Sequence, residues 1–146
     1  MASTTIPAVK AGLLTVLEGI SVLTDANVDI RYAEHAERRR DAVWMGSTTS
    51  SEIEPMGFRS GAPRRKETVE IALWVEARET KPLDAETTAF SYVTAIESAL
   101  VADPDLGGVT GLRWCSVTAI EAATVDGGDG AYCQIELTIE CTGVFL

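Results

Sequence analysis

The stretch ETVEIALWVEA, from Glu67 to Ala77, carries the clearest strand pattern in this 146-residue chain. Apolar and polar side chains alternate along it, which is the period of an extended strand whose two faces meet different surroundings. One face is apolar throughout and consists of Val69, Ile71, Leu73, Val75 and Ala77. The pattern therefore predicts a central strand of a sheet, with one face covered by other parts of the chain.

The same alternation recurs near the C-terminal end of the chain. It predicts strands at Leu112–Val125 and Ala131–Val144, joined by the glycine-rich turn Asp126–Gly130. One face of the second strand is again apolar, with Cys133, Ile135, Leu137, Ile139 and Cys141. Two strands joined by a tight turn pair antiparallel, so we expect an antiparallel sheet with one covered face.

Apolar residues at helical spacing predict two helices that supply this cover. They recur at three- and four-residue steps over Ile6–Leu23, with Pro7 in the first turn, where a missing N–H costs nothing. We expect this helix to end near residues 24–27. A second helix is predicted over Asp84–Leu100, with Asp84 as its N-cap.

The segment between the first helix and the central strand is less regular. Alternation predicts a strand at Val28–Tyr32, and a short apolar stretch predicts another at Ala42–Met45. From Gly46 to Arg65 the sequence mixes Ser, Thr, Gly and Pro with only isolated apolar residues. Such a composition does not bury enough surface to offset its ordering entropy. We expect a long loop or loose hairpin that orders on contact with a partner.

These elements predict an α+β fold in the order α-β-β-(long loop)-β-α-β-β. One mainly antiparallel sheet of about five to six strands is expected to pack against two α-helices. A chain of this length typically forms one domain with a sizeable core. We therefore expect a single domain over residues 1–146, with a flexible loop at about 46–65.

Charge is distributed unevenly along the chain, which has a formal net charge of −10. Residues 31–66 contain eight basic and five acidic residues and so carry +3, which leaves −13 for the remainder. An acidic body repels a phosphate backbone, so tight sequence-independent DNA binding is not expected. The basic segment could instead meet an acidic protein surface, although a run such as Arg38, Arg39 and Arg40 is often only a solvated face.

The residues that usually carry catalysis or metal binding form no recognisable site in this sequence. His35 is the only histidine and stands between Glu34 and Glu37, as expected for a surface position. The serines lie outside any nucleophile-elbow context, and the glycine pairs outside any phosphate-binding motif. Carboxylate pairs occur at Asp103 with Asp105 and at Asp126 with Asp129, without the distal glutamate of a calcium loop. We expect no catalytic, metal or cofactor site.

Cysteine and tryptophan are expected to act through packing. The three cysteines, Cys115, Cys133 and Cys141, form no CxxC pair and lie in apolar or alternating sequence, which is typical of reduced, buried thiols. All three tryptophans fall on predicted strands, where core or subunit-interface packing is expected: Trp44, Trp74 and Trp114. No apolar run approaches the roughly 20 residues of a membrane span, and the first residues lack the features of an export signal.

The element order and several pieces of local sequence resemble the tail terminator family of long-tailed bacteriophages. The pieces are IPAVKAGLLTVLEGI (residues 6–20) running into VDIRY (28–32), VWMG (43–46), ETVEIALWVEA (67–77) and AIESALVADPDLGGVTGLRWCSV (95–117). The resemblance covers nearly the whole chain and depends on the combination of these pieces, because the family has no invariant signature.

This resemblance implies a structural protein of the virion, made in the host cytoplasm and placed at the head–tail junction. It implies a homohexameric ring on the last ring of the major tail tube protein, which ends tube polymerisation and docks the head-completion or stopper protein. Genomic DNA would pass through the lumen without specific binding, and no membrane or cofactor is involved. We expect the ring or tube interface to include Arg38, Arg39, Arg40, Trp44, Phe58, Arg59, Arg64 and Arg65.

Two other functions remain open on the sequence. A head-closure or adaptor protein of the same neck region has a similar fold and would give the same pattern of elements. A small-molecule-binding or enzymatic α+β domain would instead have a polar pocket between the helices and the sheet.

Overall fold

The computed structural model describes residues 5–34, 40–59 and 62–145. The described helices are α1 (Ile6–Glu18), α2 (Ser21–Asp25) and α3 (Pro82–Ala102). The described strands are β1 (Asp29–Arg31), β2 (Ala42–Arg59), β3 (Ala62–Glu79), β4 (Leu112–Asp126) and β5 (Ala131–Phe145). The two long C-terminal strands form where the sequence pattern places them. The second long helix also forms there, but the prediction of Asp84 as its N-cap is wrong: α3 begins at Pro82 after Lys81, and Asp84 lies inside its first turn.

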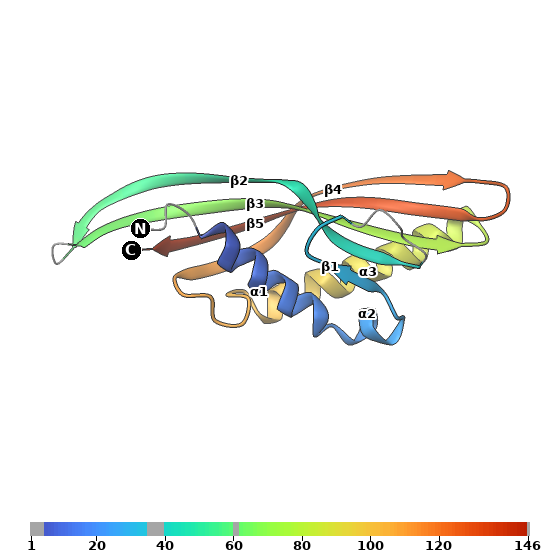
Figure 1. Ribbon diagram of the computed structural model, residues 1–146, viewed down its shortest axis with the longest axis horizontal. Helices are drawn as coiled ribbons and strands as arrows, with labels where there is room; N and C mark the ends of the chain where they lie inside the picture. Colours follow the sequence, from blue (N-terminus) through green and yellow to red (C-terminus); the bar gives the residue numbers. More distant parts are fainter. Residues whose placement is uncertain (1–4, 35–39, 60–61, 146) are drawn as a thin grey trace.

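All described strands join one sheet in the order β1-β2-β3-β5-β4. β1 runs parallel to β2, and every other neighbouring pair is antiparallel. The helices lie together on one face of this sheet (Figure 1). The α+β prediction with a mainly antiparallel sheet is confirmed, and β3 takes the central position expected for it.

The core lies between the sheet and the helices. Val69, Ile71, Leu73, Val75 and Ala77 of β3 are all buried, as are the alternating apolar residues of β5. They form one cluster with residues of α1 and α3, including Val9, Leu13, Leu17, Ala89, Val93 and Ile96. Strict alternation thus directs one face of both strands toward the helices, as the sequence indicates.

A buried carboxylate fixes the start of α1 on β3. Glu67 is 0% exposed, and one of its carboxylate oxygens accepts hydrogen bonds from the backbone N–H (2.7 Å) and the hydroxyl of Thr5. Thr5 is the residue immediately before α1. A negative charge at a helix N-terminus is favourable, because the first N–H groups of the helix point toward it.

The prediction of one continuous helix to residues 24–27 is wrong. α1 ends at Glu18, and the N–H of Gly19 bonds back to the carbonyls of Thr15 and Val16. Ile20 has an extended backbone (φ −79, ψ 112), after which the short helix α2 begins. Apolar spacing does not detect this break, because Ile20 and Leu23 are buried after the turn as they would be in a continuous helix.

The prediction of a long loop over Gly46–Arg65 is also wrong, and the alternative of a hairpin is correct. Residues 46–59 belong to β2 and residues 62–65 to β3, with Ser51 opposite Val69 and Arg59 opposite Ala62. Composition predicts disorder here because it takes no account of the partner strand β3, whose paired residues lie 3 to 22 positions further along the chain. Pairing with the strongly patterned strand β3 supplies the hydrogen bonds that this segment does not obtain from its own side chains.

Two irregularities in β2 explain its proline and glycine content. The register shifts between Met45 and Thr49 and again between Pro55 and Phe58, where Gly57 has a φ of +80°. β1 covers β2 only at residues 42–44, so in the described part of the chain the far edge of β2 is open around Pro55. Proline is tolerated at such an edge because its missing N–H breaks no ladder bond.

The molecule is elongated along the strands. The β2–β3 hairpin extends past the helices at one end, and the turn between β4 and β5 lies at the other end (Figure 1). Near the hairpin end, β5 pairs with β3 only as far as Arg65, opposite Phe145. Beyond that pair the hairpin is only two strands wide, and it projects as a narrow arm.

A buried tyrosine ties α3 to the start of β2. The hydroxyl of Tyr92, a residue 4% exposed, donates a 2.5 Å hydrogen bond to Asp41, whose other carboxylate oxygen accepts from the backbone N–H of Arg78. Burial, this hydrogen bond and the charge of Asp41 raise the pKa of Tyr92 above its ordinary value. The neutral phenol is therefore the form that the folded chain favours.

Tyr92 makes the stability of the fold depend on alkaline pH. Its pKa is higher in the folded chain than the value of about 10 for an unfolded tyrosine, so its contribution is complete well below pH 10 and decreases as the pH rises through that value. Urea unfolding should show the free-energy gap between the wild type and Tyr92→Phe shrinking from about pH 9 to about pH 11. A gap independent of pH in this range would contradict the assignment.

Candidate assembly surface

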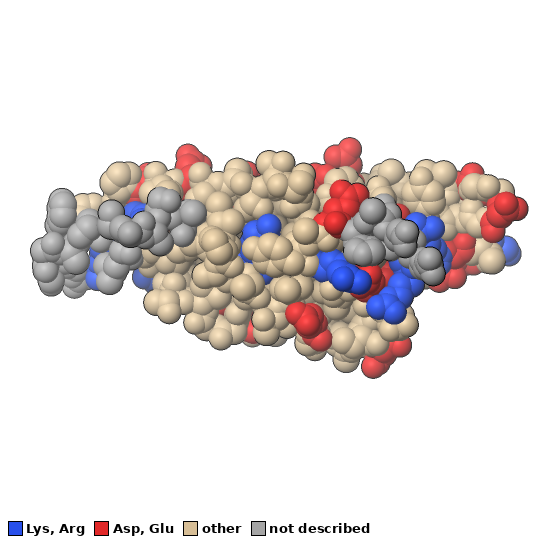
Figure 2. Space-filling model, viewed as in Figure 1, with Lys and Arg blue, Asp and Glu red and all other residues tan. Residues whose placement is uncertain are grey.

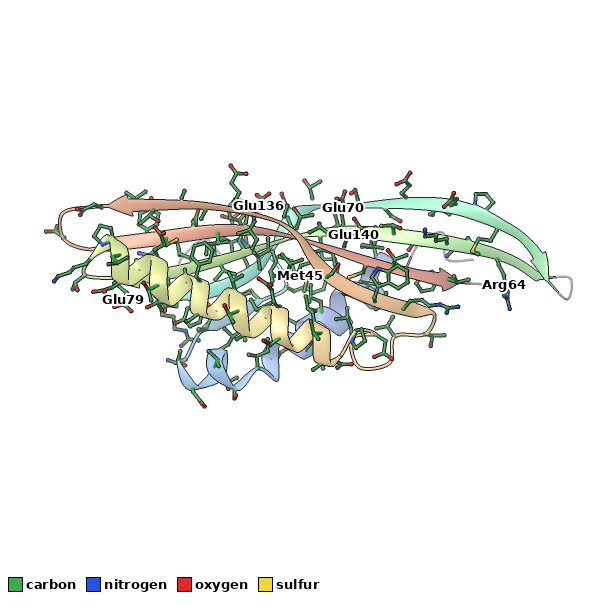
Figure 3. All side chains as sticks on the ribbon, turned by 180° about the vertical axis from the view of Figure 1, so that it is seen from behind. Met45, Arg64, Glu70, Glu79, Glu136 and Glu140 are labelled. Carbon is green, nitrogen blue, oxygen red and sulfur yellow. The ribbon has the colours of Figure 1, made fainter. Side chains whose placement is uncertain are left out.

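The sheet face opposite the helices carries many of the carboxylates of the strands. We call it the outer face, and it includes Glu52 of β2, Glu70 and Glu76 of β3, Glu121 of β4, and Glu136 and Glu140 of β5. Figure 3 shows Glu70, Glu136 and Glu140 pointing away from the helices. The face is acidic because the polar positions of β3 and β5 alternate with core positions, and many of them are glutamate.

The strand register brings these carboxylates next to one another. Glu70 lies directly opposite Glu140, and Glu121 lies directly opposite Glu136. Like charges at directly opposite positions destabilise a sheet. Among the described residues, no ion pair includes any of these four side chains; the one pair on this face joins Arg78 to Glu76 at 3.4 Å. The outer face therefore keeps its negative charge in the single chain.

Two tryptophans pack together on the same sheet face. Trp44 and Trp74 lie opposite each other on β2 and β3, with ring centroids 6.3 Å apart and planes inclined by 13°. Trp44 is only 4% exposed, so within the single chain it is part of the packing. Its role in a subunit interface stays a prediction. Trp114, on β4, is 50% exposed and offers its ring more openly to a partner.

The described basic residues of the segment 31–66 fall into two separate groups. Arg40 stands just before β2, is exposed, and lies 3.8 Å from Asp29, while Arg64 and Lys66 are exposed near the other end of the β2–β3 hairpin. Lys66 lies opposite Glu54, so residues 42–54 of β2 separate the two groups by on the order of 40 Å. The basic segment of the sequence is thus not one continuous surface.

The remaining predicted interface residues are placed as follows. Arg65 is partly buried on β3, and Figure 3 shows Arg64 at the hairpin end. Phe58 and Arg59 are at the end of β2, with side chains outside the described part. Arg38, Arg39 and His35 lie outside the described residues. Figure 2 shows basic side chains beside the grey atoms at the hairpin end.

Three aspartates of the predicted carboxylate pairs stabilise their own turns. Asp103, Asp105 and Asp126 each accept a hydrogen bond from a glycine N–H in their own turns, at 3.0–3.2 Å. No group of three or more His, Cys, Asp or Glu in the part of the chain that the structure describes could hold a metal ion. No described helix is both long and apolar enough to cross a membrane.

The cysteines are buried and free, as predicted. Cys115 and Cys141 occupy opposite positions on β4 and β5. A hydrogen bond with Cys115 and burial both raise the pKa of the Cys141 thiol. A thiol held in its neutral form is a poor nucleophile and a poor metal ligand.

A groove of about 630 Å³ lies between α1, α2 and the C-terminal part of α3. Its walls consist mostly of apolar and small residues, such as Val16, Ile20, Ala95 and Ala99. Asp103 is its one titratable side chain. This lining lacks the convergent polar groups that usually orient a small-molecule substrate.

Comparison with solved structures finds a similar fold in a viral particle. A chain from a structure described as the virion of a native gene transfer agent particle matches with a TM-score of 0.69 and 15% sequence identity. The match covers 99% of this chain and 100% of the other. At this identity it shows a shared fold over the full length of both chains. No protein-family model and no curated protein matches the sequence.

Proposed function

We propose that this chain is a virion structural protein that forms a homohexameric ring at the head-proximal end of a phage-like tail tube. There it ends tube polymerisation and offers a docking surface to the head-completion protein. The observation that carries the proposal is the fold shared over the full chain with a component of a gene transfer agent virion. The resemblance of local sequence to tail terminators supports a position at the end of the tail tube.

The distribution of charge supports assembly over catalysis. A ring closed by rotation needs two different, complementary surfaces on each subunit. This chain carries an acidic outer face and, on a projecting arm, a basic end. Its function would then depend on shape and contact, and would need no cofactor.

The net charge of −10 suits a ring through which DNA passes. A surface that neutralises phosphates holds DNA through the release of counterions, whereas an acidic body does not. Genomic DNA would then cross the lumen without being retained. The basic groups would serve contacts with protein, including the tail tube.

Tube polymerisation in vitro tests the proposal. Purified tube protein should form long tubes alone, and adding this chain before polymerisation should yield shorter tubes with extra density at one end in negative-stain micrographs. Unchanged tube lengths with bare ends would refute a terminator role. Gold labelling of assembled particles would show where the chain lies in the particle. Label on the portal side, away from the tube, would instead identify a head-closure or adaptor ring.

A further inference from the structure

The half of the outer face near the β2–β3 hairpin contains an acidic depression. It has a volume of about 330 Å³ and is lined by Ser50, Ser51, Glu52, Thr68, Glu70 and Glu140. Within the described residues, one of its three carboxylates accepts a hydrogen bond: the hydroxyl of Ser50 donates to Glu70 at 3.4 Å. Three negative side chains thus share one depression, and no ion pair found among the described residues includes any of them.

An exposed aromatic ring lies beside this depression. Trp114 of β4 is opposite Thr142, and the next outer-face position of β4, Ser116, is opposite Glu140. Trp114 is 50% exposed. A carboxylate group flanked by an open indole face suits a guanidinium or ammonium group, which gains both ion pairing and a cation–π contact.

The arm of the β2–β3 hairpin, together with its base at Arg65 and Lys66, carries groups of this kind. Residues 55–66 contain four basic residues and no acidic residue: Arg59, Arg64, Arg65 and Lys66. Arg64 and Lys66 are exposed, and so is Met56, at 54%. The arm therefore offers positive charge together with some apolar surface.

The tip of the arm does not reach the depression of its own chain. Arg64 lies on β3, four residues before Thr68 and six before Glu70, whereas Lys66 is two residues before Thr68 and borders the depression. At about 3.3 Å per residue, a continuous strand holds Arg64 roughly 13–20 Å from Thr68 and Glu70 along its axis. Because β3 is paired with its neighbours on both sides at Lys66, it does not bend back on itself.

We propose that the basic arm of one copy docks on the outer face of a second copy, over the depression lined by Glu52, Glu70 and Glu140. This inference rests on the proposed function for the closed ring. It extends that function by naming the two surfaces that meet. Since arm and depression are unlike, each copy uses its arm on one neighbour and its depression on the other. Such head-to-tail contacts close into a ring when the rotation between copies allows it.

Charge reversal provides the first part of the test. The variants Arg64→Glu/Lys66→Glu and Glu70→Lys/Glu140→Lys should each abolish the multimer that wild-type chain forms at low salt and high concentration, as measured by sedimentation velocity. An equimolar mixture of the two should assemble again, because each arm then meets a face of opposite charge. The variant Glu18→Lys/Glu97→Lys, on exposed helix positions, is the matched control and should assemble like the wild type.

Zero-length crosslinking of a mixture of ¹⁴N- and ¹⁵N-labelled wild-type chains provides the second part and does not depend on variants folding. Lys66 of one copy should be joined to Glu52, Glu70 or Glu140 of another, with peptides of mixed isotope label. Lack of such peptides, a wild type that remains monomeric at low salt, or crosslinks of Lys66 only to added tube protein would overturn the proposal. Self-association is measured without tubes, so this result is independent of whether the chain ends tube growth.

Discussion

Replacing Ile139 by alanine should lower the free energy of unfolding by about 3 kcal/mol. Ile139 is 0% exposed on β5, opposite Ile71 of β3 and Val117 of β4. Removing its side-chain carbons leaves a cavity between the sheet and the helices that the surrounding structure fills only partly. The loss is a large part of the 5–15 kcal/mol that typically stabilises a domain. Urea unfolding followed by circular dichroism measures it.

Ile120→Ala is the matched control for this prediction. Ile120 is the same residue type on the neighbouring strand β4, but its side chain is 47% exposed. Its replacement should cost less than about 1 kcal/mol, since little apolar area is returned to water. Equal losses for the two variants would mean that the core does not lie where the structure places it.

Replacing Gly143 by alanine should destabilise the chain by about 2–3 kcal/mol. A Cβ at this position would lie 2.5 Å from the carbonyl oxygen of Gly111, 2.6 Å from the ring of Phe145 and 2.9 Å from the Cα of Leu112. Two of these three atoms belong to the backbone, so the clash is relieved only by moving the start of β4 away from β5. Thermal unfolding should show a midpoint lower by several degrees.

Gly130→Ala separates this clash from the general effect of losing a glycine. Gly130 also has an ordinary backbone conformation, and its nearest contact for a new Cβ is the carbonyl of Glu79 at 3.5 Å. Its replacement should therefore leave the melting temperature nearly unchanged. A Gly143→Ala variant as stable as Gly130→Ala would show that β4 and β5 approach less closely near residue 111.

Much of the fold follows from local sequence because the core strands alternate strictly. The pattern of Val69, Ile71 and Leu73 predicts both the strand and the face that is buried, and burial confirms it. The distal half of β2 lacks such a pattern, because its edge is open and its side chains are mostly exposed. Only its pairing with β3, whose partner residues lie 3 to 18 positions away along the chain, makes it a strand, and composition carries no information on that pairing.

The sequence predicts the acidic outer face only in part. The polar positions of β5 include Glu136 and Glu140, so an acidic edge to that strand is evident. That Glu140 lies opposite Glu70 depends on the register between two strands about 70 residues apart, which sequence periodicity does not fix. For the arginines, the sequence predicts a single surface that the structure divides. Arg40 and Arg64 belong to one basic segment of the sequence, but they lie near opposite ends of the long β2–β3 hairpin.

Electron cryomicroscopy of the assembled particle tests the central claim most directly, namely that this chain acts as a closed ring of identical copies where the tail tube meets the head. We expect a density map in which six copies of this fold surround the channel at the head-proximal end of the tube, each arm lying on the sheet of its neighbour. A single copy per particle, or a particle that lacks the chain, would contradict the account.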